Sequence, residues 1–157
     1  MSDKNLMHYV VVTGILINNE GKFLITKRAD WEKAFPGRWT VPGGKLKVLD
    51  YVLKEKDTKE HWYNVFEDVL KREVKEEVGL DVEPVKLLLV QEAIYPADYI
   101  KHEHYIFLDY LCRTNSSEVK LDGKEIQEYV WTSLSSAFQL DLESFTPWDR
   151  RSIQMCK

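Results

Sequence analysis

The sequence predicts an α/β fold in which a mixed β-sheet lies between layers of helix. Apolar, β-branched runs separated by turn residues predict several strands, and one long amphipathic pattern in the middle of the chain predicts a helix. Shorter helical signals follow near the C-terminus. Strands mixed with two or three helices favour this layered arrangement. The 157 residues are close to the common domain size, so we expect one domain with a sizeable core.

The first third of the chain predicts three strands. Tyr9–Ile17 is an apolar, β-branched run, and Lys22–Lys27 returns from it as a second strand. The turn between them ends in Gly21, where a positive φ is expected. Trp39–Val41 is a short third strand that enters a loop at Gly43-Gly44.

The middle of the chain predicts a helix over Val65–Val78. Its apolar residues form one broad arc at about 100° per residue, as expected for a helix that packs on a core. Gly79 fits the left-handed position just past the helix end. The residues of the arc are Val65, Phe66, Val69, Leu70, Val74 and Val78.

The remaining elements alternate between strand and helix. Val85–Ala93 predicts a long, largely buried strand, and His104–Cys112 predicts its partner. Glu128–Thr132 predicts a further strand, followed by a short helical turn at Ser133–Phe138. Pro147–Met155 predicts a terminal helix with the proline in its first turn.

Composition and charge exclude several classes of function. Apolar content of 44% and charged content of 31% are ordinary for a globular protein, and the net charge of −4 argues against binding to DNA or RNA polymers. Only Cys112 and Cys156 are present, without metal-ligand spacing, so we expect reduced thiols and a cytoplasmic protein. The sequence has neither a secretory signal pattern nor an apolar run of about 20 residues that would span a membrane.

Three carboxylates on the predicted helix carry the chemistry. Glu73, Glu76 and Glu77 lie at spacings that share one helix face, where like charges repel by roughly 0.2–0.5 kcal/mol per pair. Glu73 and Glu77 project into the middle of the apolar arc and Glu76 lies at its edge. A divalent cation would offset the repulsion, and hard oxygen ligands suit Mg²⁺ or Mn²⁺. The alternative is a solvated, glutamate-rich surface, which the apolar flanks and the Gly79 stop disfavour.

The stretch Arg72-Glu73-Val74-Lys75-Glu76-Glu77-Val78-Gly79-Leu80 resembles the second half of the Nudix box, G-x5-E-x7-R-E-U-x-E-E-x-G-U with U aliphatic. Trp39-Thr40-Val41-Pro42-Gly43-Gly44-Lys45 is similar to the segment that enters this box. The resemblance implies a Nudix-like α/β/α sandwich with a mixed β-sheet. It also implies metal-dependent hydrolysis of a pyrophosphate bond in a nucleoside diphosphate-linked molecule or nucleoside triphosphate.

The box departs from the family pattern in one place. Its first glutamate falls on Asp50 when counted forward from Gly44, and on Asn64 when counted back from Arg72. An insertion at about residues 49–63 therefore splits the box. Either Asp50 has been displaced from the site or Asn64 replaces the glutamate, and we prefer Asn64 as an N-cap of the helix. The insertion, with His61-Trp62-Tyr63, is expected to form a lid or a homodimer contact.

The family pattern and the helical wheel together assign roles. We expect Glu73 and Glu77 to bind the metal, with Glu76 as the third ligand or as the base that deprotonates water. Arg72 resembles the arginine that holds these glutamates in place. Gly43 would let the backbone approach a phosphate, and the carbonyl of Gly44 is a further candidate ligand.

Residues outside the box complete the prediction. Glu125, after a turn at Asp122-Gly123, is preferred over Glu128 as an additional catalytic acid, and Arg28, Arg38 and Tyr95 are candidates for binding the phosphates and the base of a small nucleotide. The sequence does not identify which nucleotide is the substrate. The alternative function is a catalytically weak, nucleotide-binding sensor domain, favoured only by Asn64 and the split box.

Overall fold

A computed structural model describes residues 7–94, 103–137, 144–147 and 149–156. Its strands are β1 (Tyr9–Ile17), β2 (Phe23–Arg28), β3 (Trp39–Thr40), β4 (Gly43–Lys45), β5 (Glu83–Ile94), β6 (His104–Arg113) and β7 (Ile126–Thr132). Its helices are the 3₁₀ turn η2 (Val48–Asp50), α1 (Val65–Val78), α3 (Leu134–Ala137) and α4 (Asp149–Gln154). The predicted bounds of the central helix are confirmed, and its C-cap Gly79 has the expected positive φ of 73°.

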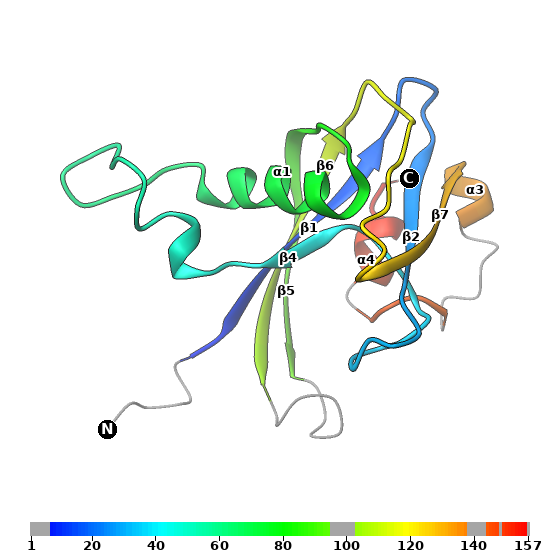
Figure 1. Cartoon of the computed structure of the whole chain (residues 1–157), viewed down its shortest axis with the longest axis horizontal. Coiled ribbons are helices and arrows are strands. Elements are labelled where there is room, and N and C mark those ends of the chain that lie inside the picture. The colour runs from blue at the N-terminus through cyan, green and yellow to red at the C-terminus, as the bar shows by residue number, and fades with distance from the viewer. Residues whose placement is uncertain (1–6, 95–102, 138–143, 148, 157) are drawn as a thin grey trace.

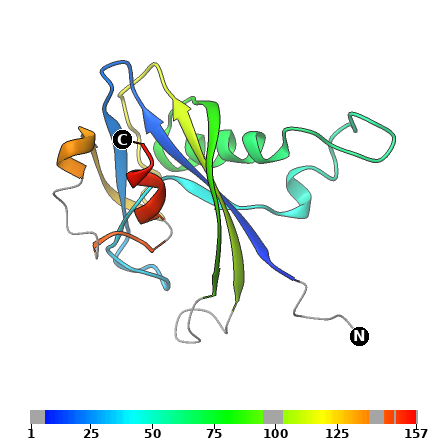
Figure 2. The same ribbon diagram turned by 180° about the vertical axis from the view of Figure 1, so that it is seen from behind.

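The strands form one mixed sheet with helix on both faces, which confirms the predicted fold class. The strand order is β3-β2-β1-β6-β5, with β4 paired to β1 and β7 paired to β2. Strands β1 and β6 run parallel, and the other pairs are antiparallel. Helix α1 covers one face and the short α4 lies on the other (Figures 1 and 2).

Alternating side chains of β1 build a separate core on each face of the sheet. Val12 and Leu16 pack against Leu70 and Val74 of α1 in the larger cluster. Ile15 instead joins Phe23, Ile25, Val41, Phe145 and Ile153 on the α4 face. This period-two alternation fixes the position of α1, and therefore of its carboxylates, over the centre of the sheet.

The Gly43-Gly44 segment is a strand, which corrects the loop expected from the sequence. As part of β4, Gly43 and Gly44 pair with Thr13 and Val12 of β1. Glycines are poor strand formers in general, but at these two positions there is no room for a side chain. A Cβ at Gly43 would overlap the backbone of Val12, and one at Gly44 would overlap the carboxyl group of Glu73.

Strand β5 is an edge strand, so the prediction that Val85–Ala93 is largely buried is wrong. Within the described chain its only sheet neighbour is β6, which confirms the predicted partner. Its register shifts twice along that pairing. Val85, Leu87, Val90 and Ile94 are 49%, 43%, 46% and 65% exposed. Apolar composition indicated strand here, but it cannot distinguish an edge strand from a central one.

The C-terminal elements are shorter than predicted or begin elsewhere. Strand β7 begins two residues before the expected Glu128, and α4 begins at Asp149, after Pro147. Phe138 lies outside the described residues. The carboxylate of Asp149 is fully buried, and one of its oxygens accepts hydrogen bonds from the hydroxyls of Thr40 and Thr146, each at 2.6 Å, and from the N–H of Val41 at 3.1 Å. These bonds join α4 to the segment that leads into β4.

Candidate active site

The two inward-facing glutamates of α1 lie against strand β4. The side chain of Glu73 is 13% exposed, and Glu77 as a residue is only 4% exposed. Because Gly44 has no side chain, its backbone approaches the carboxyl group of Glu73 closely. The N–H of Gly43 donates a long hydrogen bond of 3.4 Å to Glu77 Oε2. Both box glycines therefore border the carboxylates, as the sequence predicted for a site of backbone approach.

Negative charge accumulates at this place without an equal number of cations. Burial raises the pKa of Glu77 well above its ordinary value, and the charges of Glu125 and Glu73 raise it further. Burial also raises the pKa of Glu73, although Arg72 opposes this effect. Since Glu125 acts on both glutamates, three carboxyl groups from two separate parts of the chain share one electrostatic field.

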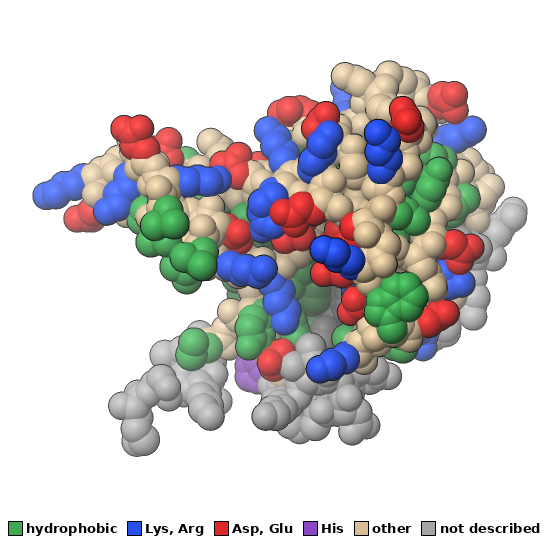
Figure 3. Space-filling view, viewed as in Figure 1, with side chains coloured by type: hydrophobic (Ala, Val, Ile, Leu, Met, Phe, Trp, Pro, Cys, Tyr) green, Lys and Arg blue, Asp and Glu red, His purple; other side chains and the backbone are tan. Residues whose placement is uncertain are grey.

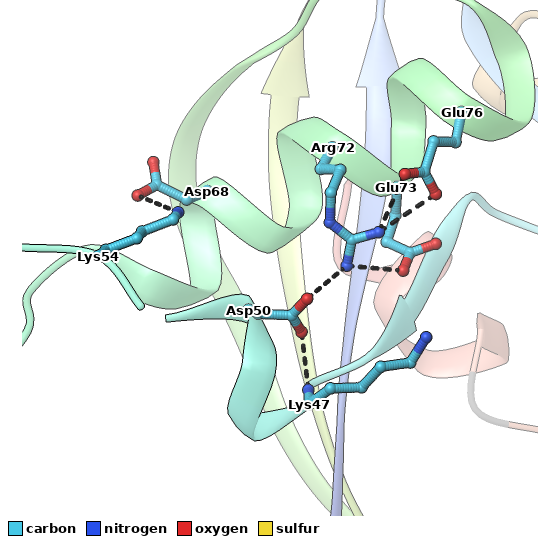
Figure 4. A network of polar contacts seen from close by, with 7 residues as sticks. All are labelled: Lys47, Asp50, Lys54, Asp68, Arg72, Glu73 and Glu76. Atoms are coloured by element: carbon cyan, nitrogen blue, oxygen red, sulfur yellow. Dashed lines mark hydrogen bonds and ion pairs between the residues drawn. The ribbon is translucent and has the colours of Figure 1, made fainter. Parts of the chain in front are cut away.

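A single arginine organises the outer side of the site (Figure 4). Arg72 Nη2 lies 2.9 Å from Asp50 Oδ1 and 3.1 Å from Glu73 Oε1, and Nη1 lies 3.2 Å from both carboxylate oxygens of Glu76. Burial lowers the pKa of Arg72, but the hydrogen bond to Glu76 and the charges of Glu73 and Asp50 outweigh burial and raise it. The expected role of Arg72 in holding the box glutamates agrees with these contacts.

Asp50, and not Asn64, supplies the acid missing from the split box. Its side chain is 10% exposed, and its second oxygen accepts the Lys47 N–H at 2.7 Å. Asn64 has a left-handed backbone with φ 58° and makes no side-chain capping bond. Asn64 is the N-cap residue of α1, as preferred, but it caps through its backbone carbonyl and not through its side chain. Asp50 contacts Arg72 and is therefore not displaced from it. Counting forward from Gly44 was the signal that identified Asp50, because the insertion follows it.

Glu76 does not join Glu73 and Glu77. Its side chain is 57% exposed and bonds to Arg72, one turn earlier on the helix. Across the described ranges, no group of three acidic, histidine or cysteine side chains is assembled closely enough to bind a metal ion. In this conformation the inward-facing members of the expected trio are Glu73 and Glu77, and the charges of the exposed Glu76 and of Glu125 both raise the pKa of Glu73.

Glu125 is better placed than Glu128. Asp122 Oδ1 accepts the N–H of Lys124 at 2.9 Å and that of Glu125 at 3.4 Å, and Gly123 has a φ of 70°, so the expected turn is present. Glu128 is part of β7 and forms an exposed ion pair of 3.1 Å with Lys27. The electrostatic effect of Glu125 on Glu73 and Glu77 favours the sequence preference for Glu125.

Of the candidate substrate-binding arginines, Arg28 lies within electrostatic reach of Glu125. Arg28 Nε donates a hydrogen bond to the Ala34 carbonyl at 2.9 Å, and its Nη2 lies 3.4 Å from Glu32. Burial raises the pKa of Glu125, and the charge of Arg28 opposes this effect. Arg38 is half-buried, and its carbonyl accepts the Arg28 N–H at 2.9 Å. Tyr95 lies outside the described residues.

Lys47 is a functional candidate that the sequence reasoning missed. It follows Gly44 by three residues, and its side chain extends from beside Asp50 along the same side of the site as Glu73 (Figure 4). Its charge lowers the pKa of Glu125 against the larger effect of burial. Among the described residues it has no ion-pair partner within 4.0 Å. The box pattern gave no signal for it, since the position is variable in that pattern.

These residues have the chemistry of a divalent cation site. Glu73, Glu77 and Glu125 supply hard oxygen donors, and the backbone of Gly44 lies close to the carboxyl group of Glu73. A buried carboxylate such as Glu77 normally has a cationic partner or becomes neutral. Arg72 forms an ion pair with Glu73 on the outer side, whereas Glu77 has no ion-pair partner within 4.0 Å among the described residues. A small, doubly charged ion fits that deficit.

Comparisons with known proteins agree with this geometry. The family model of the NUDIX domain matches residues 7–156. Nucleoside triphosphatase NudI of Escherichia coli K12 is 30% identical over 142 residues, which cover 83% of this chain and 86% of NudI. The MutT NUDIX hydrolase from Burkholderia pseudomallei has a similar fold, with a TM-score of 0.71 and 24% identity over 96% of this chain and 99% of that chain. The NUDIX domain of Shewanella oneidensis NrtR, solved with ADP ribose, has a TM-score of 0.69 at 15% identity, covering 99% and 91% of the two chains.

Proposed function

Because this chain belongs to the Nudix family of pyrophosphohydrolases, we propose that it hydrolyses a pyrophosphate bond of a small nucleotide with the help of Mg²⁺, or of Mn²⁺ in its place. The observation that carries this proposal is the buried Glu77 beside Glu73, on a helix whose carboxylates meet the backbone of Gly43 and Gly44. A nucleoside triphosphate is the first substrate to test, since the relative NudI carries the name nucleoside triphosphatase.

The residues divide the work of hydrolysis between holding an ion and moving a proton. Glu73 and Glu77 would hold the ion, with Glu125 and the Gly44 carbonyl as further donors. When bound, a divalent ion neutralises charge on the phosphate oxygens and the leaving group and lowers the pKa of water. Arg72 fixes the orientation of Glu73 by its ion pair of 3.1 Å. Glu76, bonded to Arg72, is assigned to holding that arginine.

The reaction is a displacement at phosphorus. The oxygen of a water molecule forms a bond to one phosphorus, the bridging P–O bond breaks, and the leaving phosphate departs with the bonding electron pair. Glu125 is our choice for the base that accepts the proton of the water, because its pKa is raised while the residue remains exposed to solvent. Glu76 is the second choice for this role.

Two cations face the acidic group and would contact the substrate phosphates. Arg28 and Lys47 both lower the pKa of Glu125 against the effect of burial, so both lie within its electrostatic reach. Arg28 presents a planar fork suited to phosphate oxygens, whereas Lys47 offers a compact charge. Arg38, bonded to Arg28 through the backbone, would add to the positive field.

The proposal extends to the organisation of the protein. We propose one catalytic domain with an insertion at residues 51–63, inside the range of about 49–63 expected from the sequence. We also propose a small nucleotide as substrate and a cytoplasmic location. No helix in the described part of the chain is long and apolar enough to cross a membrane. The insertion remains the candidate for a lid or a homodimer contact. The alternative function is a catalytically weak, nucleotide-binding sensor domain. The contact of Asp50 with Arg72 supports the catalytic proposal over it.

One assay separates these alternatives. Purified protein is given a panel of nucleoside triphosphates, ADP-ribose and a dinucleoside polyphosphate, and release of phosphate and pyrophosphate is measured with Mg²⁺, with Mn²⁺ and with EDTA. We expect metal-dependent turnover of at least one nucleoside triphosphate. Turnover that persists in EDTA would contradict the metal role, and binding without turnover of any compound would favour the sensor.

A further inference from the structure

The insertion is a folded arm that begins beside the contact between Asp50 and Arg72 and ends at the start of α1. The arm, residues 51–63, begins directly after Asp50 and ends one residue before the N-cap of α1. It extends away from the sheet in Figure 1, and in Figure 3 a hollow separates it from the lower part of the molecule. None of its residues belongs to the core clusters of the described chain. The arm must therefore obtain its order from its own contacts.

Those contacts centre on one indole ring. The ring of Trp62 lies 5.2 Å from the ring of Tyr51 in an edge-on arrangement, and the ammonium of Lys56 lies 5.2 Å from the Trp62 ring. The indole N–H donates to the Lys54 carbonyl at 3.0 Å. Trp62 thus joins the last residues of the arm to its first residues. Tyr51, its ring partner, is the residue next to Asp50.

Three further contacts complete the arm. The N–H of Tyr63 donates to the Asp57 carboxylate at 2.8 Å, and the Asp57 N–H donates to the His61 carbonyl at 3.0 Å, which closes the tip. Lys54 Nζ lies 3.6 Å from Asp68 on α1 (Figure 4), so the base of the arm also contacts the catalytic helix. Both ends of the arm are consequently fixed relative to Arg72.

The insertion lengthens the chain between Asp50 and Arg72, so the arm must be ordered if the two residues are to stay in contact. In an uninterrupted box the first acid and the arginine are separated by a short segment, whereas here Asp50 and Arg72 are 22 residues apart. Of this separation, the 13 residues 51–63 lie outside α1. A flexible loop of that length would give Asp50 many positions relative to Arg72, and ordering it costs conformational entropy. An ion pair with a partly exposed arginine is too weak to meet that cost alone.

We infer that Trp62 is a positioning residue for catalysis: its indole fastens the arm through Tyr51 and Lys54 so that Asp50 remains against Arg72, which in turn orients Glu73. Trp62 touches neither the carboxylates nor a substrate site. Its effect on the reaction passes through Asp50. The activity readout of this inference rests on the proposed function, so a second readout must be independent of turnover.

The activity test compares three variants of the arm. Trp62→Ala is expected to lower kcat/KM by about 10-fold, comparable to the loss of an outer-shell partner. Trp62→Phe keeps the ring contacts and loses the N–H, so it should retain part of the activity. Tyr63→Ala is the matched control, because this neighbouring aromatic residue is 58% exposed. Its hydrogen bond to Asp57 is donated by the backbone N–H, which the substitution keeps. It should behave as wild type.

A double-mutant cycle distinguishes positioning from general stability. If Trp62 acts through Asp50, the pair Asp50→Asn and Trp62→Ala together should be no slower than Asp50→Asn alone. The thermal midpoint of Trp62→Ala should stay close to wild type, because the arm is outside the core clusters. Full activity of Trp62→Ala, or losses that multiply in the double variant, would overturn the inference.

The readout without substrate is limited proteolysis. Trypsin cleaves after lysine, and the arm carries Lys54, Lys56 and Lys59. Trp62→Ala should be cut within the arm much faster than wild type or Tyr63→Ala, while the rest of the chain stays resistant. Cleavage at the wild-type rate would overturn the proposed fastening even if the protein hydrolysed no nucleotide, so failure of this inference is distinct from failure of the proposed function.

Discussion

Asp50 Oδ1 and Arg72 Nη2 lie 2.9 Å apart although 22 residues of chain separate them. The contact brings an acid from the end of η2 onto an arginine in the middle of α1. Arg72 in turn reaches Glu73 and Glu76, so one guanidinium group connects three carboxylates. The order of the site therefore depends on a segment that is foreign to the family pattern.

Replacing Asp50 by Asn should weaken catalysis without abolishing it. The amide keeps the size of the side chain but removes the charge beside Arg72, so Glu73 becomes less well oriented. We expect kcat/KM to fall by about 10-fold, as for other outer-shell partners of a metal ligand. Glu55→Gln, which neutralises another carboxylate of the arm, is the control. Equal kinetics for both variants would show that Asp50 has no catalytic importance.

Replacing Glu77 by Gln should nearly abolish activity and stabilise the metal-free protein. Loss of one electrostatic stabiliser should cost at least about 100-fold in kcat. Burial raises the pKa of Glu77 in the folded protein above its value in the unfolded chain. As the pH rises above the unfolded-state pKa, the unfolded chain loses this proton more readily, so the free energy of unfolding falls. In EDTA, the thermal midpoint of the variant should exceed that of wild type, and by more at pH 8 than at pH 5. Mg²⁺ should raise the midpoint of wild type only.

Glu76→Gln is the matched comparison on the same helix. Its side chain is exposed and bonded to Arg72, so the variant should lose less activity than Glu77→Gln and should still be stabilised by Mg²⁺. A loss as large as that of Glu77→Gln would place Glu76 among the metal ligands or identify it as the base, as the sequence first suggested.

Replacing Lys47 by Met should raise KM more than it lowers kcat. The ammonium has no ion-pair partner among the described residues, and its charge lies close enough to lower the pKa of Glu125. We expect KM for a nucleoside triphosphate to rise by about 10-fold, equivalent to roughly 1.4 kcal/mol of phosphate binding. Lys59→Met removes an exposed charge from the arm and serves as control. An unchanged KM in Lys47→Met would exclude the proposed phosphate contact.

Asp149 should make the stability of the protein depend on pH. Burial raises its pKa from 3.8 to about 7, despite the hydrogen bonds from Thr146 and Thr40. Between these values the unfolded chain releases a proton that the folded chain retains, so stability falls as pH rises, by at most about 4 kcal/mol. In urea unfolding with EDTA, Asp149→Asn should show a smaller decline between pH 4 and pH 7. An identical pH profile would contradict this account.

The helix and its inward carboxylates could be predicted because their signals are local. Apolar periodicity defined Val65–Val78, the wheel placed Glu73 and Glu77 inside, and Gly79 marked the end. The β1–β2 hairpin and the pairing of β5 with β6 were likewise confirmed. Each of these features depends on residues close together in the sequence or on one strong composition signal.

Features that depend on distant partners could not be predicted. The burial of β5 depends on its place in the strand order, which no property of residues 83–94 encodes. Gly43 and Gly44 form a strand because β1 and Glu73 leave room only for backbone. Whether Asp50 or Asn64 contacts Arg72 depends on how the arm folds. Lys47 lies near Glu125 because it follows shortly after β4.

The contact between Gly44 and Glu73 also limits how this protein can be redesigned. Because any substituent on the α-carbon of Gly44 would collide with a carboxyl group, a library that varies this position would yield mostly non-functional clones. Efforts to change which nucleotide is accepted should therefore leave the paired glycines untouched.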